Sequence, residues 1–340
     1  MFAREAIFAS CALILFMEKY YLITHDINNP YFNIASEEYL LKEKDGFYYY
    51  FWINEPAVIV GTNQNTLAEV NLSFVEEKGI KVVRRLTGGG AVYHDLNNLC
   101  YTVIAPYEEN ENNYKKFTAP IIEYLNELGV KAVFSGRNDI TVNGLKISGN
   151  AQTVYKNRIM HHGTLLFNTD VSVLAGALKP NKLKTESKGI KSARARVTNI
   201  CDWLPVKMDV NELKLGLIEK FSKVAEKYEF TIQDLDRINQ LKDQKYSTFD
   251  WNVGQSPKGK ITFEEKFDFG IVNLNFDVVL GKMENVHITG DFFSKKPIME
   301  MEEKLNGIPF DKKQVMQSLN GIENYIVGAT PIDIANKLFN

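Results

Sequence analysis

A glycine-rich turn is the first stretch whose composition suits chemistry. Three glycines let a backbone approach a ligand closely and turn N–H groups towards its oxygen atoms. An arginine beside them adds a planar fork that suits phosphate or carboxylate. The spacing is neither that of a P-loop nor that of a dinucleotide fingerprint, and a flexible hairpin corner explains the glycines about equally well. The residues are Arg84, Arg85, Gly88, Gly89, Gly90, Ala91, Val92 and Tyr93.

A second candidate is a hairpin that carries a lysine. Asn143-Gly144 between two alternating runs predicts a two-residue turn. That register places Ile140 opposite Ile147 on a buried face, and it gathers the polar side chains on the other face. Those side chains are Asp139, Thr141, Lys146 and Ser148. A solvated face explains this arrangement when the hairpin is considered alone. The polar residues that flank it favour another interpretation, in which Lys146 stabilises charge on a reacting acyl phosphate.

Two further stretches hold groups that could contact a ligand. His161 and His162 are adjacent on an expected strand and face opposite ways, so we predict no metal site there. His162 is taken as the histidine that lines the pocket, and a structural role for both histidines explains the pair equally well. Residues 179–196 are crowded with lysine and arginine. A solvated surface and a loop that closes over a ligand both fit that composition.

The elements that must position these residues follow from apolar periodicity and turn signals. Apolar or alternating runs predict strands at 19–25, 47–53, 57–61, 81–85 and 98–105, and a β meander over 131–167 with a polar connection after Gly149. Amphipathic patterns predict helices at 30–44, 71–78, 112–128, 171–178 and 210–228. A domain boundary is predicted near 245–260, where residues 250–259 are loop-like. After it, three alternating runs and two helical patterns predict a small second domain. The mixture indicates an α+β protein with a mixed sheet.

Composition limits the class of protein. The chain has 340 residues, of which 45% are apolar and 24% charged, so it can form one large globular domain and a smaller one. A formal net charge of -2 argues against a chain-wide nucleic-acid surface. Cys11, Cys100 and Cys201 form no C-x-x-C pair, which argues against a zinc or disulfide framework and favours a cytoplasmic protein.

The first sixteen residues have an export-like composition. Residues 6–16 are apolar and follow Arg4, but a bilayer span needs about 20 apolar residues. No small-residue cleavage site follows, and the chain continues directly into an expected strand. We interpret residues 1–16 as an upstream extension and predict no membrane association.

Several ordered stretches together resemble the lipoate-protein ligase A family, which is related in fold to the biotin protein ligases. The resemblance extends from about residue 17 to the C-terminus and is densest between residues 56 and 200. It implies a catalytic domain over residues 17–250 and an accessory α+β domain over residues 261–340. The matching text is PAVIVGTNQNTLAEVN (56–71), RRLTGGGAVYHD (84–95), SGRNDITVNGLKISGNAQ (135–152), HHGTLLFNTD (161–170) and SKGIKSARARVTN (187–199).

The resemblance implies a two-step reaction that serves lipoate salvage. Lipoate and ATP, with Mg²⁺, would give lipoyl-AMP and pyrophosphate, and a carrier lysine would then displace AMP. The implied carriers are the lipoyl domains of 2-oxoacid dehydrogenase E2 subunits and the glycine-cleavage H protein. The family also suggests a monomer.

The resemblance assigns roles to individual residues. Lys146 matches the lysine that contacts both the acyl carbonyl and the phosphate. Arg85 and the backbone from Gly90 to Tyr93 match the adenylate-binding turn, and residues 179–197 match the loop that folds over the adenylate. We add Asp139 and His162 to the predicted site and expect the lipoyl tail to lie in a tunnel beside the turn.

Three alternative functions remain open. A lipoyl or octanoyl transferase of the same superfamily would need a cysteine nucleophile near the pocket, and residues 171–178 contain none. Cys100 falls in an expected core strand and Cys201 beyond the cationic stretch. A biotin ligase fits the turn and the hairpin less well. A non-catalytic protein that senses lipoyl domains or adenylates is the third alternative, against which the intact Arg85 and Lys146 argue.

Overall fold

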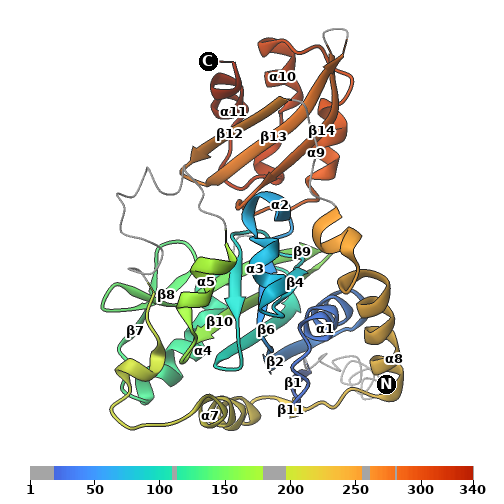
Figure 1. The fold of residues 1–340 in the computed structure, drawn as a ribbon. Coiled ribbons are helices and arrows are strands. Elements are labelled where there is room, and N and C mark those ends of the chain that lie inside the picture. Colours follow the sequence, from blue (N-terminus) through green and yellow to red (C-terminus); the bar gives the residue numbers. More distant parts are fainter. Residues whose placement is uncertain (1–18, 109–112, 179–196, 255–260, 280–281, 340) are drawn as a thin grey trace, which may run out of the picture.

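The structure is a computed structural model that describes residues 19–108, 113–178, 197–254, 261–279 and 282–339. Two units follow each other along the chain, a larger one up to Gly254 and a smaller one from Ile261 (Figure 1). Within the described part of the chain, no helix is both long and apolar enough to cross a bilayer. The predicted extension 1–16, the cationic stretch 179–196 and residues 255–260 lie outside the described residues.

An eight-stranded mixed sheet forms the centre of the larger unit. Its strands lie in the order β11-β1-β2-β6-β10-β9-β8-β7. β1 pairs in parallel with both β2 and β11, and the remaining neighbours are antiparallel. The bounds are β1 (Tyr20–Thr24), β2 (Phe47–Ile53), β6 (Asn98–Pro106), β7 (Ala132–Ser135), β8 (Asp139–Val142), β9 (Leu145–Tyr155), β10 (Arg158–Leu166) and β11 (Glu226–Lys227).

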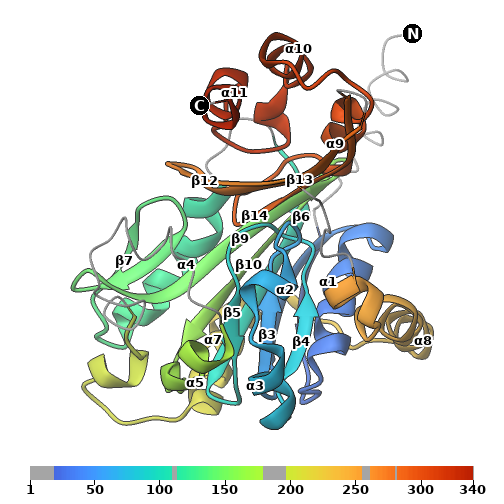
Figure 2. The same ribbon diagram turned by 45° about the horizontal axis from the view of Figure 1, so that its top comes forward.

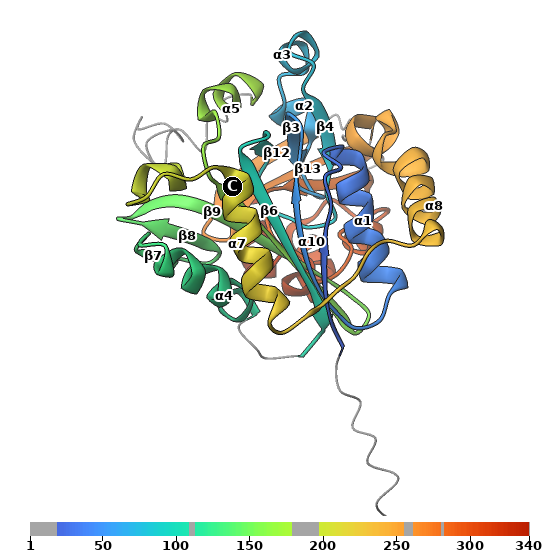
Figure 3. The same ribbon diagram turned by 90° about the horizontal axis from the view of Figure 1, so that it is seen from below.

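The central strands are apolar on both faces because other elements cover each face. In β2, Phe51 and Ile53 join one core while Tyr50 and Trp52 join another, as the two-residue period of a strand requires. Helices α4 and α7 cover the first face, and α1 and α8 pack beside the second (Figure 3). Their bounds are α1 (Pro30–Glu43), α4 (Asn113–Glu127), α7 (Val210–Ser222) and α8 (Ile232–Leu241).

A three-stranded sheet in the order β4-β3-β5 carries the glycine-rich turn. Its central strand pairs in parallel with β4 and antiparallel with β5, so the turn joins the two outer strands. The bounds are β3 (Ala57–Val60), β4 (Lys81–Arg84) and β5 (Val92–His94), with α2 (Thr66–Glu69), α3 (Leu72–Glu77) and α5 (Val171–Ala177) nearby.

The smaller unit has its own core. Its antiparallel sheet lies between three helices and the larger unit (Figure 2). Apolar residues of the sheet, such as Leu274 and Phe276, pack against Leu305 and Ile334 of the helices. The bounds are β12 (Ile261–Phe267), β13 (Gly270–Val279), β14 (Lys282–Gly290), α9 (Met299–Leu305), α10 (Lys312–Ser318) and α11 (Pro331–Leu338).

The predicted fold class, a mixed-sheet α+β unit followed by a smaller α+β unit, is confirmed. Three details are wrong. Residues 250–254, predicted to be loop-like, form a short π-helical turn, and the rest of the predicted loop lies outside the described residues. The helix predicted over 210–228 ends at Ser222, because residues 226–227 pair with β1 as the edge strand β11. The polar connection predicted after Gly149 is strand instead, because β9 continues to Tyr155 and pairs with β10, with Asn150 buried and Gln152 and Thr153 half-buried.

Candidate active site

Arg85 holds the glycine-rich turn from within. Its buried guanidinium donates to the carbonyl oxygens of Ile59 (3.0 Å), Gly88 (2.8 Å) and Gly90 (2.9 Å). Its Nε donates to Thr87 Oγ1 (2.9 Å). Burial lowers the pKa of Arg85 to about 10, so the group keeps its charge at neutral pH. In this structure Arg85 therefore shapes the turn and does not present a free fork to a ligand.

Two glycines are required by the geometry of the turn. Gly89 has φ +95°, a left-handed conformation that side chains rarely adopt. A Cβ on Gly61, in the neighbouring loop, would lie 2.0 Å from the carbonyl oxygen of Gly89. The turn and the loop that follows β3 are thus packed backbone against backbone.

Arg84, which the sequence analysis did not assign to the site, anchors the loop that follows β3. Neighbouring residues of an extended chain point to opposite sides, so Arg84 and Arg85 hold different loops. The Arg84 Nη1 donates to the carbonyl oxygens of Gly61 (3.1 Å), Thr62 (3.1 Å) and Gln64 (2.7 Å). Its Nε donates to the carbonyl oxygen of Trp251 (3.0 Å) and its Nη2 to Thr66 Oγ1 (2.7 Å), so every nitrogen of this buried side chain has an acceptor.

His162 joins the turn to the central sheet. Its Nε2 lies 2.7 Å from Thr87 Oγ1, and its Nδ1 lies 2.9 Å from Glu37 Oε1. A Glu37 carboxylate can only accept, so we assign the His162 proton to Nδ1, which donates to Glu37. In that tautomer Nε2 accepts from the Thr87 hydroxyl, which itself accepts from Arg85. His162, predicted to line the pocket, thus supports the turn.

Glu37 is the residue of this network that sequence reasoning missed. An acidic side chain in a helix is ordinarily solvated, yet Glu37 is only 1% exposed. Its Oε1 also accepts from Thr102 Oγ1 (2.6 Å). Its Oε2 is buried without a hydrogen-bond partner among the residues that the structure describes.

His161 faces the other side of β10, as predicted. Gln152 Nε2 donates to its Nδ1 (2.9 Å), and its Nε2 lies 3.2 Å from Asn150 Oδ1. Burial lowers the pKa of His161 to about 3, so it is neutral near pH 7. The two histidines have separate partners, and His161 is a structural residue of the core.

The lysine hairpin forms around Asn143-Gly144, as predicted. Both residues have positive φ, +49° and +78°, as a type I′ turn requires. The predicted register holds as far as the pair of Thr141 and Lys146 and is wrong beyond it. A β-bulge inserts Ile147, so that Ile140 pairs with Ser148 and not with Ile147.

The bulge changes which side chains share a face. Ser148 is fully buried and accepts from Asn150 Nδ2 (3.3 Å), so its predicted place beside Lys146 is wrong. Lys146 Nζ lies 2.7 Å from Asp139 Oδ1, an ion pair by distance without hydrogen-bond alignment, and both side chains are about one-third exposed. A Cβ on Gly149 would lie 2.8 Å from Lys146 Nζ, so this glycine makes room for the amine.

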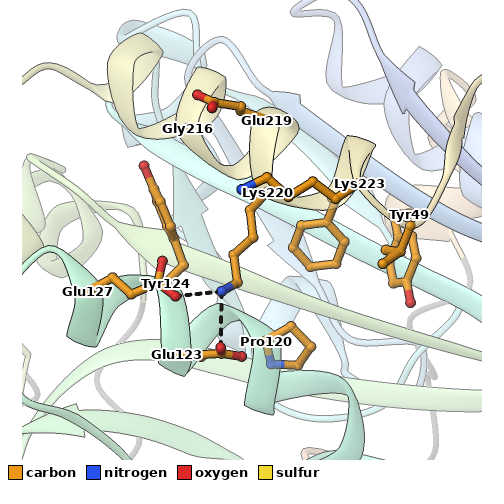
Figure 4. A pocket seen from close by; sticks show the side chains of 11 residues that line it. Tyr49, Pro120, Glu123, Tyr124, Glu127, Gly216, Glu219, Lys220 and Lys223 are labelled. Carbon is orange, nitrogen blue, oxygen red and sulfur yellow. Dashed lines mark hydrogen bonds and ion pairs between the residues drawn. The ribbon is translucent and has the colours of Figure 1, made fainter.

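Two surface grooves lie away from these residues. One lies between α4 and α7, where Lys220 forms ion pairs with Glu123 and Glu127 (Figure 4). The other lies at the end of β1 and includes His25 and Lys214. Neither groove includes Arg85, Lys146 or His162. No group of three or more histidine, cysteine, aspartate or glutamate side chains among the described residues could hold a metal ion.

Comparison with known proteins gives two matches that correspond to the two units. The family model for the lipoyl protein ligase A/B catalytic domain matches residues 29–222, and that for the bacterial lipoate protein ligase C-terminus matches residues 256–338. The chain belongs to the lipoate-protein ligase family. Lipoate-protein ligase LplJ of Bacillus subtilis is 41% identical over 329 residues, which cover 94% of this chain and 99% of LplJ.

Two solved structures extend this likeness to the fold. P. falciparum LipL1 in complex with lipoate has a TM-score of 0.73 and 26% identity, over 94% of this chain and 97% of its own. A lipoate-protein ligase A bound with ATP has a TM-score of 0.60 and 28% identity, over 70% of this chain and 99% of its own.

The described cysteines of this lipoate-protein ligase family member are poorly suited to be nucleophiles. Cys100 is buried in β6, with Sγ 3.5 Å from His94 Nδ1, and burial raises the pKa of its thiol well above the usual range. Burial, reinforced by Asp202, also raises the pKa of Cys201. A thiol whose pKa is raised forms little thiolate at neutral pH.

Proposed function

We propose that this protein is an ATP-dependent lipoate-protein ligase that forms lipoyl-AMP and transfers the lipoyl group to a lysine of a carrier domain. Its likeness to lipoate-protein ligases over nearly its whole length supports this activity. Two observations carry the proposal: Arg85 binds the carbonyl groups of the turn, and Lys146 is one-third exposed. Because its carbonyl groups point to Arg85, the turn can offer N–H groups to a phosphate, and Lys146 can offer its amine.

We assign adenylate binding to the turn and acyl activation to the hairpin. Backbone from Gly90 to Tyr93, held by Arg85, would contact the phosphate of the adenylate. Lys146 would stabilise charge on the acyl carbonyl and the phosphate, with Asp139 orienting its amine. His162 would act as a positioning residue, because it reaches the turn through the Thr87 hydroxyl.

The proposed reaction needs no covalent enzyme intermediate. A carboxylate oxygen of lipoate attacks the α-phosphorus of ATP, and the bond to the bridging oxygen of pyrophosphate breaks. The neutral lysine amine of the carrier then attacks the acyl carbon, an amide forms as the nitrogen loses a proton to solvent, and AMP leaves with the electron pair of the broken C–O bond. Exclusion of water protects the acyl adenylate between the two steps.

The finer features belong to the same proposal. Mg²⁺ would enter with ATP and neutralise charge on its phosphates. Residues 17–250 would form the catalytic domain, residues 179–197 the loop over the adenylate, and residues 261–340 the accessory domain. The carriers would be the lipoyl domains of E2 subunits and the glycine-cleavage H protein, modified by a monomer in the cytoplasm.

Mass spectrometry of an apo lipoyl domain tests the proposal. The domain is incubated with this protein, lipoate and Mg²⁺, with and without ATP. We expect the mass of one lipoyl group on one lysine, only when ATP is present. Modification that requires an acyl-carrier or lipoyl-protein donor instead would indicate a transferase, and no modification from any donor would leave a binding role.

A further inference from the structure

The accessory unit contacts the glycine-rich turn through a short segment at the end of β14. This docking segment comprises Gly290–Phe293. The N–H of Gly290 donates to the carbonyl oxygen of Asn63, and the N–H of Gly89 donates to the carbonyl oxygen of Phe292 (3.2 Å). A Cβ on Gly88 would lie 2.3 Å from that same carbonyl oxygen. The Gly89 N–H is a donor of the kind that an anion would use, and here it donates to a carbonyl oxygen instead.

The docking segment also reaches Arg137, in the connection between β7 and β8. The ring of Phe293 lies beneath the Arg137 guanidinium, whose carbon is 4.3 Å from the ring centroid. Arg137 Nη1 donates to the carbonyl oxygen of Phe269, a second residue of the accessory unit (3.2 Å). Within the described residues, Arg137 forms no ion pair with a carboxylate. An exposed guanidinium beside the site is therefore held only by a ring and a carbonyl group.

Phe293 lies between the glycine-rich turn and Arg137. One edge of its ring would lie 3.4 Å from a Cβ on Gly89, and its face contacts Arg137. The side chain is 7% exposed and also lies edge-on to Tyr114. If the docking segment were lifted, the Gly89 N–H and the Arg137 guanidinium would face the same space. Both are donors that bind phosphate oxygens well.

We propose that Arg137 is a further phosphate-binding residue. Without ATP it contacts Phe269 and Phe293 of the accessory unit, and ATP displaces both contacts. This assignment rests on the proposed ligase function. The turn and Lys146 already account for the α-phosphate, so Arg137 suits the β- and γ-phosphates. When the α-phosphorus bonds to the carboxylate, the electron pair of the broken P–O bond stays on pyrophosphate, and Arg137 offsets that charge without transferring a proton.

Binding of inorganic pyrophosphate, measured by titration calorimetry on the full chain, tests the assignment directly. We expect Arg137→Ala to bind pyrophosphate roughly 10- to 100-fold more weakly than the wild type, because a charge-assisted contact is lost. Arg137→Lys should recover part of this loss. Arg237→Ala is the matched control. Arg237 lies on the surface of α8 and pairs with Glu43 of α1, so this variant should bind pyrophosphate as tightly as the wild type. Equal affinity in Arg137→Ala and wild type, or no binding to either, would overturn the assignment.

Phe293→Ala tests whether the accessory unit competes with the anion. We expect this variant to bind pyrophosphate several-fold more tightly than the wild type, because no ring has to be displaced from Arg137. Affinity equal to that of the wild type would overturn the holding role. Affinity lost to the same extent as in Arg137→Ala would show that the accessory unit completes the site and does not obstruct it.

Two partial reactions separate this inference from the ligase proposal. In Arg137→Ala we expect the KM for ATP in lipoate-dependent pyrophosphate release to rise by about the same factor as pyrophosphate affinity falls. Transfer from supplied lipoyl-AMP to an apo lipoyl domain should stay within about twofold of the wild type, because that step involves no pyrophosphate. An equal loss in both steps would overturn the phosphate role. A wild type that binds pyrophosphate through Arg137 but performs neither step would refute the ligase and leave the anion site standing.

Discussion

The glycine-rich turn and the lysine hairpin, the two parts of the proposed site, are built in opposite ways. The turn is buried, and Arg85 fixes the carbonyl groups of Gly88 and Gly90 before any ligand arrives. The hairpin leaves Lys146 about one-third exposed, in an ion pair with Asp139. Groups that are fixed in advance need no reorganisation when charge develops, whereas an exposed ion pair can exchange partners. The comparison teaches that the turn is rigid before a ligand binds, whereas the charged amine of the hairpin can change its partner.

The largest effect on activity should come from Lys146→Ala. We expect pyrophosphate release to fall by at least about 10³-fold, because the charge on the acyl phosphate loses its main stabilising group. The unfolding temperature should not change, because the apolar face of the hairpin is untouched. Lys131→Ala, an exposed lysine just before β7, is the control. Near-normal pyrophosphate release in Lys146→Ala would remove this residue from the mechanism.

Arg85→Ala should instead lower stability. Its removal leaves buried carbonyl groups without donors, each costing about 1–3 kcal/mol, so we expect a total loss of about 3 kcal/mol or more. ATP binding should weaken as well, because the turn loses its shape. Denaturant unfolding measures the first effect and calorimetric titration with ATP the second. Unchanged stability together with unchanged ATP dependence would show that the turn does not depend on Arg85.

Acid should destabilise the core behind the turn. Burial lowers the pKa of both His94 and His161 to about 3, far below the usual value near 6.5 of an unfolded histidine. The unfolded chain therefore binds protons first as pH falls, and stability declines below about pH 6.5. From pH 7 to pH 5 each histidine should cost about 2 kcal/mol. Denaturant unfolding should show a shallower pH dependence in His161→Gln, and an unchanged slope would contradict the neutral assignment.

The smallest effect is expected from Asp139→Asn. This change keeps the shape of the side chain and removes the charge that orients the Lys146 amine, worth about 1 kcal/mol for a half-exposed pair. Pyrophosphate release should therefore fall by about 3- to 10-fold, and the free energy of unfolding by at most about 1 kcal/mol. A loss as large as that of Lys146→Ala would mean that Asp139 contacts the reacting groups itself.

Local signals predicted the elements of both regions. The apolar run of β2 gives a strand with the predicted bounds, and Asn143-Gly144 gives the turn of the hairpin. Strand alternation could not reveal the bulge at Ile147, because one extra residue leaves the composition of the run unchanged. The resulting burial of Ser148 therefore required the structure.

Partners distant in sequence could not be predicted. Glu37 of α1 contacts His162 of β10, and the Arg84 side chain donates to the carbonyl oxygen of Trp251. These partners are far apart in the sequence, so neither contact leaves a local pattern. Residue types and spacing singled out the turn and the hairpin, and the family resemblance supplied the roles of Lys146 and Arg85, which stay predictions. The contact of Phe293 with Arg137 depends on how two units pack, which no single stretch of sequence encodes.

Isotope exchange between labelled pyrophosphate and ATP tests the central claim most directly, because it isolates formation of the acyl adenylate. The full chain is incubated with ATP, Mg²⁺ and labelled pyrophosphate, without any carrier protein. We predict label in ATP only when lipoate is present, and none with Lys146→Ala. Exchange that ignores lipoate, or that is absent until a carrier protein is added, would contradict a ligase that activates free lipoate as its adenylate.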